Sequence, residues 1–187
     1  MKAAALSAVL GLAAALLAAA PAQASLAVGA TAPDFTADAS LGGSEFTFSL
    51  AQALKHGPVV LYFYPAAFTP GCTQEAHDFA EATDSFRALG ATVIGVSHDT
   101  IETLDRFSVS ECRSKFAVAA DPDQTVIKAY DAVLAKKPEL ADRTSYVIAP
   151  DGKILAAYTN LAPDRHVEIA LNAVKAWRAH HRKTAEP

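Results

Sequence analysis

Six apolar residues follow one another without a break in the run Val59–Tyr64, written VVLYFY. A strand with one face in water alternates apolar and polar side chains, whereas an unbroken run is typical of a central strand covered on both faces. Helices packed on both sides of a sheet are the usual way to cover such a strand. The run therefore predicts an α/β domain built around a buried strand at this position.

Shorter strand and helix patterns alternate along the rest of the chain, which favours the same fold class. Further strands are expected at Thr92–Ser97, Phe116–Ala119, Ser145–Ala149 and Ile154–Tyr158, and a small N-terminal hairpin at Phe35–Ala37 and Glu45–Phe48 around Gly42 and Gly43. Helices are expected from Cys72 to about Leu89, from Ile101 to about Lys115, over Asp123–Tyr130, and from Pro163 through the apolar stripe Val167, Leu171, Val174 and Trp177. Together these patterns predict one α/β domain with an N-terminal β-hairpin.

The first 24 residues have the composition of a secretory signal peptide. Lys2 precedes an Ala/Leu-rich run, and the triplet AQA at 22–24 provides small residues for cleavage before Ser25. An uncleaved membrane anchor is the alternative, because the run is near the minimum length of a membrane span. We expect cleavage after Ala24 and export, to the periplasm. Residues 25–187 would then form a single domain with a polar tail from about residue 180.

The charge and the cysteine content narrow the functional classes. The formal net charge is −4, and no basic stripe favours a nucleic-acid partner. Two cysteines, Cys72 and Cys112, remain after the expected cleavage. In an oxidising compartment they could form a structural disulfide, although a domain of this size does not need one.

Cys72 lies in the segment TPGCTQEA, which has the features of a helix start. Thr69 is a favourable N-cap, Pro70 suits the first helical position, and Gly71 permits close approach of another group. Cys72 would then lie in the first turn, where unpaired N–H groups and the helix dipole stabilise an anion. The setting predicts a reactive thiolate rather than a structural thiol.

Magnitudes show that the helix start alone is not sufficient. Keeping most of a thiol ionised near neutral pH requires about 3.4 kcal/mol of preferential stabilisation. A helix terminus supplies about 0.3–2 kcal/mol, and a hydroxyl donor such as Thr69 adds about 1 kcal/mol. We therefore expect an arginine or lysine from elsewhere in the chain beside Cys72, in a partly dry pocket.

The spacing Pro65-x-x-x-Thr69-x-x-Cys72 resembles the active-site signature of the peroxiredoxins, in the AhpC/TSA superfamily. The fuller string FYP…TPGCTQEA is similar to their Q-type branch, also called bacterioferritin comigratory protein, and the similarity runs from the opening VGATAPDF to the final helix. The resemblance implies a thioredoxin-like fold, in which helices flank a central mixed sheet. It also implies that Arg143, in ADRTSYVIAPDGK, is the missing cation.

The resemblance further implies a thiol-dependent peroxidase that reduces hydrogen peroxide and organic hydroperoxides. The Cys72 thiolate would attack a peroxide oxygen and become a sulfenic acid. Arg143 and Thr69 would orient the peroxide and stabilise the charge that develops on its oxygens. Pro65 would shape the loop and shield the sulfur, and Phe68 would supply an apolar wall.

Glu75 has two open roles, because it could orient Arg143 or lie on the helix surface. The implied chemistry needs no metal and no organic cofactor. The expected partners are the peroxide and a thiol reductant, either a thioredoxin-like or glutaredoxin-like protein or a small thiol. We expect no nucleic acid, no membrane after signal cleavage, and a monomer or weak dimer.

Resolution of the sulfenic acid is where the chain departs from the best-known Q-type pattern. Many members carry a second cysteine five residues after the first, where this chain has His77, which we interpret as a local surface histidine. Cys112, expected toward the end of the helix before the Phe116 strand, is the internal candidate for the resolving thiol. The alternative is that Cys112 is inert and half-buried, and that an external thiol reduces Cys72.

Two other functions remain open on the sequence. A disulfide oxidoreductase of the thioredoxin type would have to work through Cys112, because no second cysteine completes a CxxC motif. A non-catalytic redox sensor or holdase would use oxidation of Cys72 to change its shape or its partner. Peroxide consumption with turnover from a thiol donor would distinguish a peroxidase from both.

Overall fold

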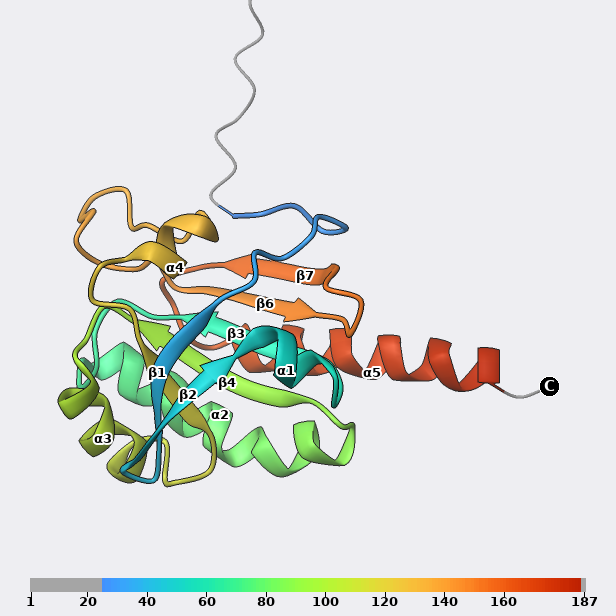
Figure 1. Ribbon diagram of the computed structural model, residues 1–187, viewed down its shortest axis with the longest axis horizontal. Coiled ribbons are helices and arrows are strands. Elements are labelled where there is room, and N and C mark those ends of the chain that lie inside the picture. The colour runs from blue at the N-terminus through green and yellow to red at the C-terminus, as the bar shows by residue number, and fades with distance from the viewer. Residues whose placement is uncertain (1–24, 186–187) are drawn as a thin grey trace, which may run out of the picture.

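A computed structural model of the protein describes residues 25–185, so the predicted signal peptide lies outside the described residues. A seven-stranded mixed sheet forms the centre of the molecule (Figure 1). Its strands are β1 (Thr36–Leu41), β2 (Ser44–Ser49), β3 (Val59–Phe63), β4 (Thr92–Ser97), β5 (Ala117–Ala120), β6 (Thr144–Ile148) and β7 (Ile154–Thr159). The helices are α1 (Leu50–Leu54), α2 (Pro70–Ala88), α3 (Ile101–Ser110), α4 (Thr125–Ala129) and α5 (His166–Ala185).

The strand order is β2-β1-β5-β4-β3-β6-β7. β3, β4 and β5 are parallel to one another, and β6 pairs antiparallel with β3. The carboxyl ends of the three parallel strands therefore meet at one edge of the sheet, which is where open α/β sheets commonly bind ligands. Cys72 follows β3 at this edge.

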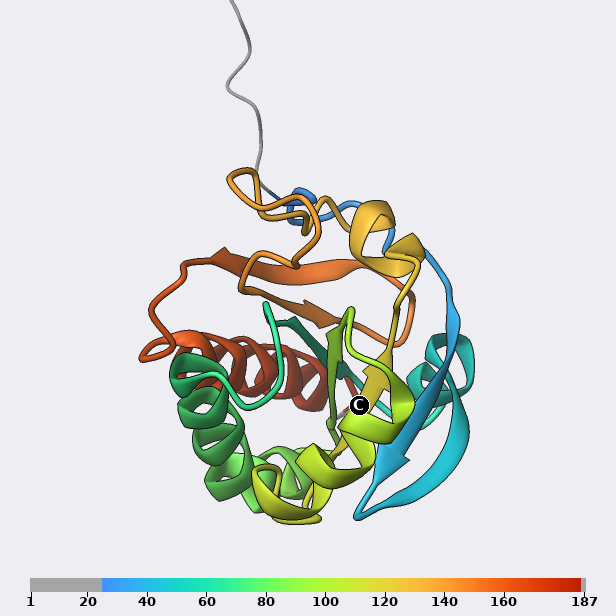
Figure 2. The ribbon, with the colours of Figure 1, turned by 90° about the vertical axis from the view of Figure 1, so that its left-hand side faces the viewer.

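Both faces of the sheet are covered, as the apolar run predicts. Val59, Leu61 and Phe63 of β3 belong to one hydrophobic core, which includes residues of α1 and α4. Val60 and Tyr62 alternate with them and belong to a second core, which includes residues of α2, α3 and α5. Figure 2 shows α2 and α5 side by side on this second face. The second core contains both cysteines.

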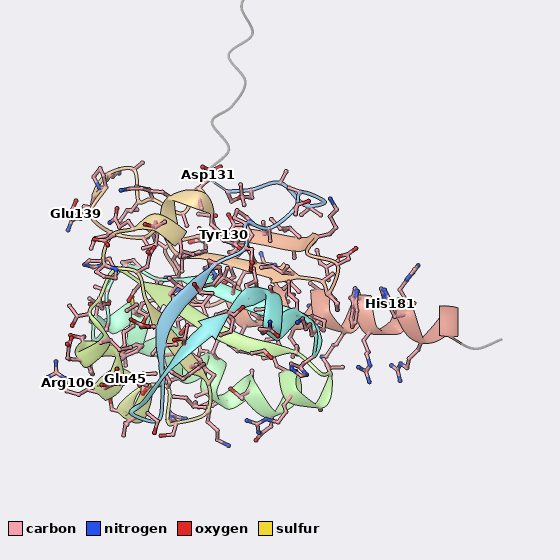
Figure 3. All side chains as sticks on the ribbon, in the orientation of Figure 1. Glu45, Arg106, Tyr130, Asp131, Glu139 and His181 are labelled. Atoms are coloured by element: carbon pink, nitrogen blue, oxygen red, sulfur yellow. The ribbon has the colours of Figure 1, made fainter. Side chains whose placement is uncertain are left out.

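The predicted N-terminal hairpin is present as β1 and β2. It turns at Gly42 and Gly43, whose φ angles of 59° and 78° suit glycine. Its tip lies against α3, where the Gly43 N–H donates to Ser108 Oγ at 2.9 Å. Figure 3 shows Glu45 and Arg106 together at this end of the molecule. The hairpin thus extends the sheet and contacts a helix of the second face.

Helices α1 and α3 differ from the prediction. α3 ends at Ser110 rather than near Lys115, because Arg113 and Ser114 adopt left-handed φ angles of 51° and 54° that a helix cannot contain. α1 was not predicted, since five residues are too few to show a helical period; Ser49 caps it by accepting from the Gln52 N–H.

The last helix, α5, continues to Ala185 through the region predicted as a polar tail. Its apolar stripe packs on the second face, with Val174 fully buried and Val167 and Leu171 partly buried against the same core. The C-terminal part extends beyond the sheet, where Figure 3 labels His181. Within residues 25–185, no helix combines the length and the hydropathy that crossing a membrane requires.

Candidate active site

Cys72 lies in the first turn of α2, immediately after β3 and its connecting loop. Thr69 is the N-cap residue and Pro70 is the first helical residue, as predicted. The Cys72 side chain carries a free thiol and is only 1% exposed. The helix start therefore directs its unpaired N–H groups and the positive end of its dipole toward a buried sulfur.

Arg143 is the cation beside this sulfur. It precedes β6, which pairs antiparallel with β3 so that Thr144 lies opposite Phe63. The residue before β6 consequently emerges beside the end of β3, next to the loop that leads to α2. Arg143 Nη2 lies 3.5 Å from Cys72 Sγ, within the range of a hydrogen bond to sulfur. The predicted juxtaposition of these two residues is present.

Three contacts fix the orientation of the Arg143 guanidinium. Its Nε donates to the Leu161 carbonyl at 2.9 Å, its Nη1 donates to Glu75 Oε2, and its Nη2 reaches the sulfur. Gly71 leaves the space that this arrangement needs, because a Cβ at that position would lie 3.1 Å from Nη2. The close approach expected at Gly71 is therefore the approach of the guanidinium.

Glu75 lies one turn after Cys72 on α2 and is fully buried. The alternative of a helix-surface residue is therefore wrong, and the contact with Arg143 fits the orienting role. Burial raises the pKa of Glu75 to about 8, although the charge of Arg143 acts in the opposite direction. Burial acts to lower the pKa of Arg143, but its contacts with Glu75 and Cys72 outweigh burial and raise that pKa. Arg143 therefore stays charged.

The loop before α2 contains the other predicted site residues. Thr69 Oγ1 donates to the Ala66 carbonyl at 3.0 Å rather than to the sulfur, and among the described residues its side chain makes no capping bond to the helix. Phe68 has a strained φ of 63°, is half exposed, and packs edge-on against Phe107 with ring centroids 5.2 Å apart. Pro65 is half-buried at the start of the loop.

Two residues that the sequence analysis did not single out anchor this loop. His98 Nδ1 donates to the Pro65 carbonyl at 3.1 Å. Asp99 Oδ2 accepts from the Ala67 N–H at 2.8 Å and from Ser97 Oγ at 2.7 Å. A signal for them existed, because both directly follow the buried strand β4 at the sheet edge where the loop emerges. They hold the backbone that leads to the helix start.

This arrangement suits nucleophilic attack by sulfur. A charged guanidinium and a helix N-terminus lie beside one buried sulfur, and the thiolate is the reactive form of a cysteine. In the part of the chain that the structure describes, no three histidine, cysteine, aspartate or glutamate side chains are grouped to hold a metal ion.

The family model described as "AhpC/TSA family" matches residues 28–157. The chain belongs to this family. Peroxiredoxin Bcp of Xanthomonas campestris is 31% identical over 149 residues, which cover 77% of this chain and 92% of that protein. Peroxiredoxin Q, chloroplastic, of Sedum lineare is 31% identical over 151 residues, which cover 80% of this chain and 78% of that protein. The crystal structure of peroxidoxin BcpB from Mycobacterium tuberculosis matches with a TM-score of 0.72 and 32% identity, covering 80% of this chain and 96% of that one.

These similarities confirm the prediction of a Q-type peroxiredoxin and of its class, a thiol-dependent peroxidase. They also confirm the thioredoxin-like fold, with helices on both faces of a mixed sheet. The roles of the individual site residues depend on the geometry described above.

The second cysteine of this peroxiredoxin, Cys112, lies in the turn after α3 and is fully buried. It is thus neither in the helix nor half-buried, as the sequence suggested. Burial, with a smaller effect of the Glu111 charge, raises the pKa of the Cys112 thiol well above its usual value.

His77 of the peroxiredoxin is half-buried and bridges two segments, which corrects its interpretation as a local surface histidine. Its Nε2 lies 2.9 Å from Oε2 of Glu111, the residue before Cys112. Two ion pairs follow along the same face of α2, Glu81–Arg113 at 3.3 Å and Asp84–Lys115 at 3.5 Å. These three side-chain contacts fasten the segment 111–115, with Cys112, to α2.

Proposed function

We propose that this peroxiredoxin reduces hydrogen peroxide and organic hydroperoxides through a sulfenic acid on Cys72. The observation that carries the proposal is the 3.5 Å contact between Arg143 Nη2 and Cys72 Sγ at the start of α2. A cation and first-turn N–H groups around one sulfur favour the thiolate, and they also stabilise negative charge on an oxygen that reacts with it.

In the first step the Cys72 thiolate attacks one peroxide oxygen. An S–O bond forms as the O–O bond breaks, so that the sulfur is oxidised and the peroxide is reduced by two electrons. The leaving hydroxide or alkoxide takes a proton from solvent and departs as water or alcohol. Arg143 stabilises the charge that develops on the oxygens, and Glu75 and the Leu161 carbonyl keep its guanidinium in place.

We propose that Cys112 resolves the sulfenic acid, forming a 72–112 disulfide with loss of water, and that an external thiol then reduces this disulfide. The segment 111–115 must open for this step because Cys112 is buried. The ion pairs of Arg113 and Lys115 are largely exposed, and each contributes about 0–1 kcal/mol. The left-handed φ angles of Arg113 and Ser114 also strain the closed form. Direct reduction of Cys72 by an external thiol is the alternative.

The test is peroxide treatment of the wild type, Cys72→Ser and Cys112→Ser, followed by intact mass and non-reducing gels. We expect Cys72→Ser to abolish peroxide consumption. The wild type should lose two hydrogens to an internal disulfide, whereas Cys112→Ser should accumulate a sulfenic acid that a small thiol reduces. Full activity in Cys72→Ser would refute the proposal. Stoichiometric oxidation without turnover from any thiol donor would indicate a redox sensor or holdase instead.

We further propose that the protein is exported and acts in the periplasm after cleavage behind Ala24. The Ala/Leu-rich N-terminus and the AQA triplet support this proposal. Fractionation of expressing cells, with N-terminal sequencing of the product, tests it. A protein that begins at Met1 in the cytoplasm would contradict it.

A further inference from the structure

Glu75 uses only one of its two carboxyl oxygens to pair with Arg143. The other oxygen, Oε1, is buried and finds no hydrogen-bond partner within residues 25–185. His166 Nδ1 lies 3.6 Å from it, slightly beyond the range of a hydrogen bond. A buried, unpaired carboxylate oxygen is unfavourable, so the group that faces Oε1 affects which protonation state Glu75 adopts.

The protonation of His166 follows from its other contacts. It is fully buried at the start of α5, and its Nε2 lies 2.9 Å from the Asn160 carbonyl. A carbonyl only accepts, so Nε2 carries the hydrogen. Burial lowers the pKa of His166 to about 4, with the charge of Arg143 acting the same way and the Asn160 bond opposing it. The ring is therefore neutral near pH 7, and Nδ1 is a lone-pair acceptor that receives Ser145 Oγ–H at 2.8 Å.

An acceptor at Nδ1 discriminates between the two forms of Glu75. An ionised Oε1 would place a second acceptor against the Nδ1 lone pair, which is repulsive. A protonated Oε1 would instead turn its hydrogen toward Nδ1, as a second and longer donor beside Ser145 Oγ. Glu75 Oε2 still accepts from Arg143 in the protonated form, so the orienting contact is kept. The raised pKa of Glu75 agrees with this geometry.

The remaining groups that face Glu75 come from three elements. Arg143, before β6, favours the ionised form, whereas Asp78 on α2 opposes it. A negative charge on Cys72, also on α2, opposes it in the same way. Tyr62 of β3 is a buried phenol whose pKa is raised, first by burial, so it stays neutral. Arg143 thus favours ionisation of Glu75, whereas burial, the two α2 groups and the His166 lone pair oppose it.

We propose that His166 is a positioning residue of the peroxidatic site, whose unprotonated Nδ1 keeps Glu75 protonated while Cys72 is a thiolate. An ionised Glu75 would neutralise Arg143 and compete with the sulfur for its charge. With Glu75 protonated, the full charge of Arg143 acts on Cys72 and on the incoming peroxide. The inference rests on the proposed peroxidase function for its effect on rate, but not for the protonation state itself.

Infrared spectroscopy tests the protonation state without relying on activity. We expect the wild type near neutral pH to show the stretching band of a buried protonated carboxyl group, and Glu75→Gln to lack it. Absence of this band from the wild type would overturn the proposal. The spectrum reports the protonation state of Glu75 even if Cys72 fails to react with peroxide. Failure of the inference and failure of the proposed function are therefore distinguishable.

The rate constant for Cys72 oxidation, measured by mass in single turnovers across pH, tests His166 itself. His166→Gln keeps an amide N–H for the Asn160 carbonyl but removes the Nδ1 acceptor. We expect the fall in rate at high pH, where Glu75 ionises, to move down by about one pH unit. Ser145→Ala is the matched control. It frees Nδ1 for Glu75 and should move the fall in rate to higher pH. Unchanged profiles, or shifts in one direction in both variants, would show that His166 only packs.

Discussion

Replacing Arg143 by methionine should slow peroxide reduction strongly while leaving the fold intact. Methionine keeps most of the side-chain length and removes the charge and the five N–H donors. The variant therefore deletes the 3.5 Å contact with Cys72 Sγ, together with the bonds to the Leu161 carbonyl and Glu75. A hydrogen bond to a charged group contributes about 1.5–3 kcal/mol. Since 1.36 kcal/mol corresponds to tenfold in rate, we expect Cys72 oxidation to slow about 10- to 150-fold.

The effect on stability should be smaller than the loss of a buried ion pair usually is. Removing one partner of such a pair costs about 3–5 kcal/mol when the other charge is left buried. Here the pKa of Glu75 is already raised to about 8 by burial, and without the cation the carboxyl group stays neutral. We expect a loss of about 1–3 kcal/mol, mainly from lost hydrogen bonds.

The assay is the second-order rate of Cys72 oxidation by hydrogen peroxide, with urea unfolding of the same samples. Arg113→Met is the matched control, because Arg113 is exposed and forms an ion pair with Glu81 at 3.3 Å, away from Cys72; it should react with peroxide at the wild-type rate. Arg143→Lys should be intermediate, since an ammonium retains the charge but not the planar fork. A folded Arg143→Met variant that reacts within threefold of the wild type would refute the role of the guanidinium.

Three further predictions concern the surroundings of the site. Gly71→Ala places a Cβ 3.1 Å from Arg143 Nη2, so we expect up to about tenfold slower oxidation without loss of thermal stability; an unchanged rate would mean that the guanidinium tolerates displacement. Tyr62→Phe removes a buried hydroxyl with no partner among the described residues and should leave the unfolding free energy equal or raise it by about 1 kcal/mol; a clear loss in urea would reveal a partner. Burial lowers the pKa of His166 to about 4. Between about pH 6.5 and pH 4, therefore, this histidine takes up a proton in the unfolded chain but not in the folded one. The contribution of His166 to the free energy of unfolding should fall by on the order of 3 kcal/mol as pH decreases through that window. Urea curves of His166→Gln should lack this component, and identical pH dependence in both proteins would show that folding does not lower the pKa of the wild-type histidine.

Local chemistry accounts for what could be predicted at the site. The run Val59–Tyr64 indicates a strand covered on both faces, and Pro70 and Gly71 mark a helix start with Cys72 in its first turn. Each depends on the preferences of adjacent residues, which a sequence displays directly. The pairing of Arg143 with Cys72 was predicted only through the family resemblance, since 71 residues separate the two.

The features that were not predicted depend on tertiary contacts. Glu75 has the same helical neighbours whether it faces solvent or core, and only the packing of α5 and β6 shows that it is buried. His166 and Ser145 form a hydrogen bond although 21 residues separate them. The early end of α3 depends on left-handed φ angles at Arg113 and Ser114, where the sequence has no glycine to indicate them. His98 is the exception, because its place behind a buried strand was readable.

The pairing of β3 with β6 has a consequence for how this enzyme can change over time. Cys72 follows β3 and Arg143 precedes the neighbouring strand β6, so the hydrogen-bonding register of the two strands sets how far apart the sulfur and the guanidinium lie. A slip of one residue would turn the guanidinium to the opposite face, and a slip of two would carry it about 7 Å away. Apolar substitutions deep in the sheet, far from any peroxide, are therefore a route by which reactivity drifts while every residue of the motif is retained.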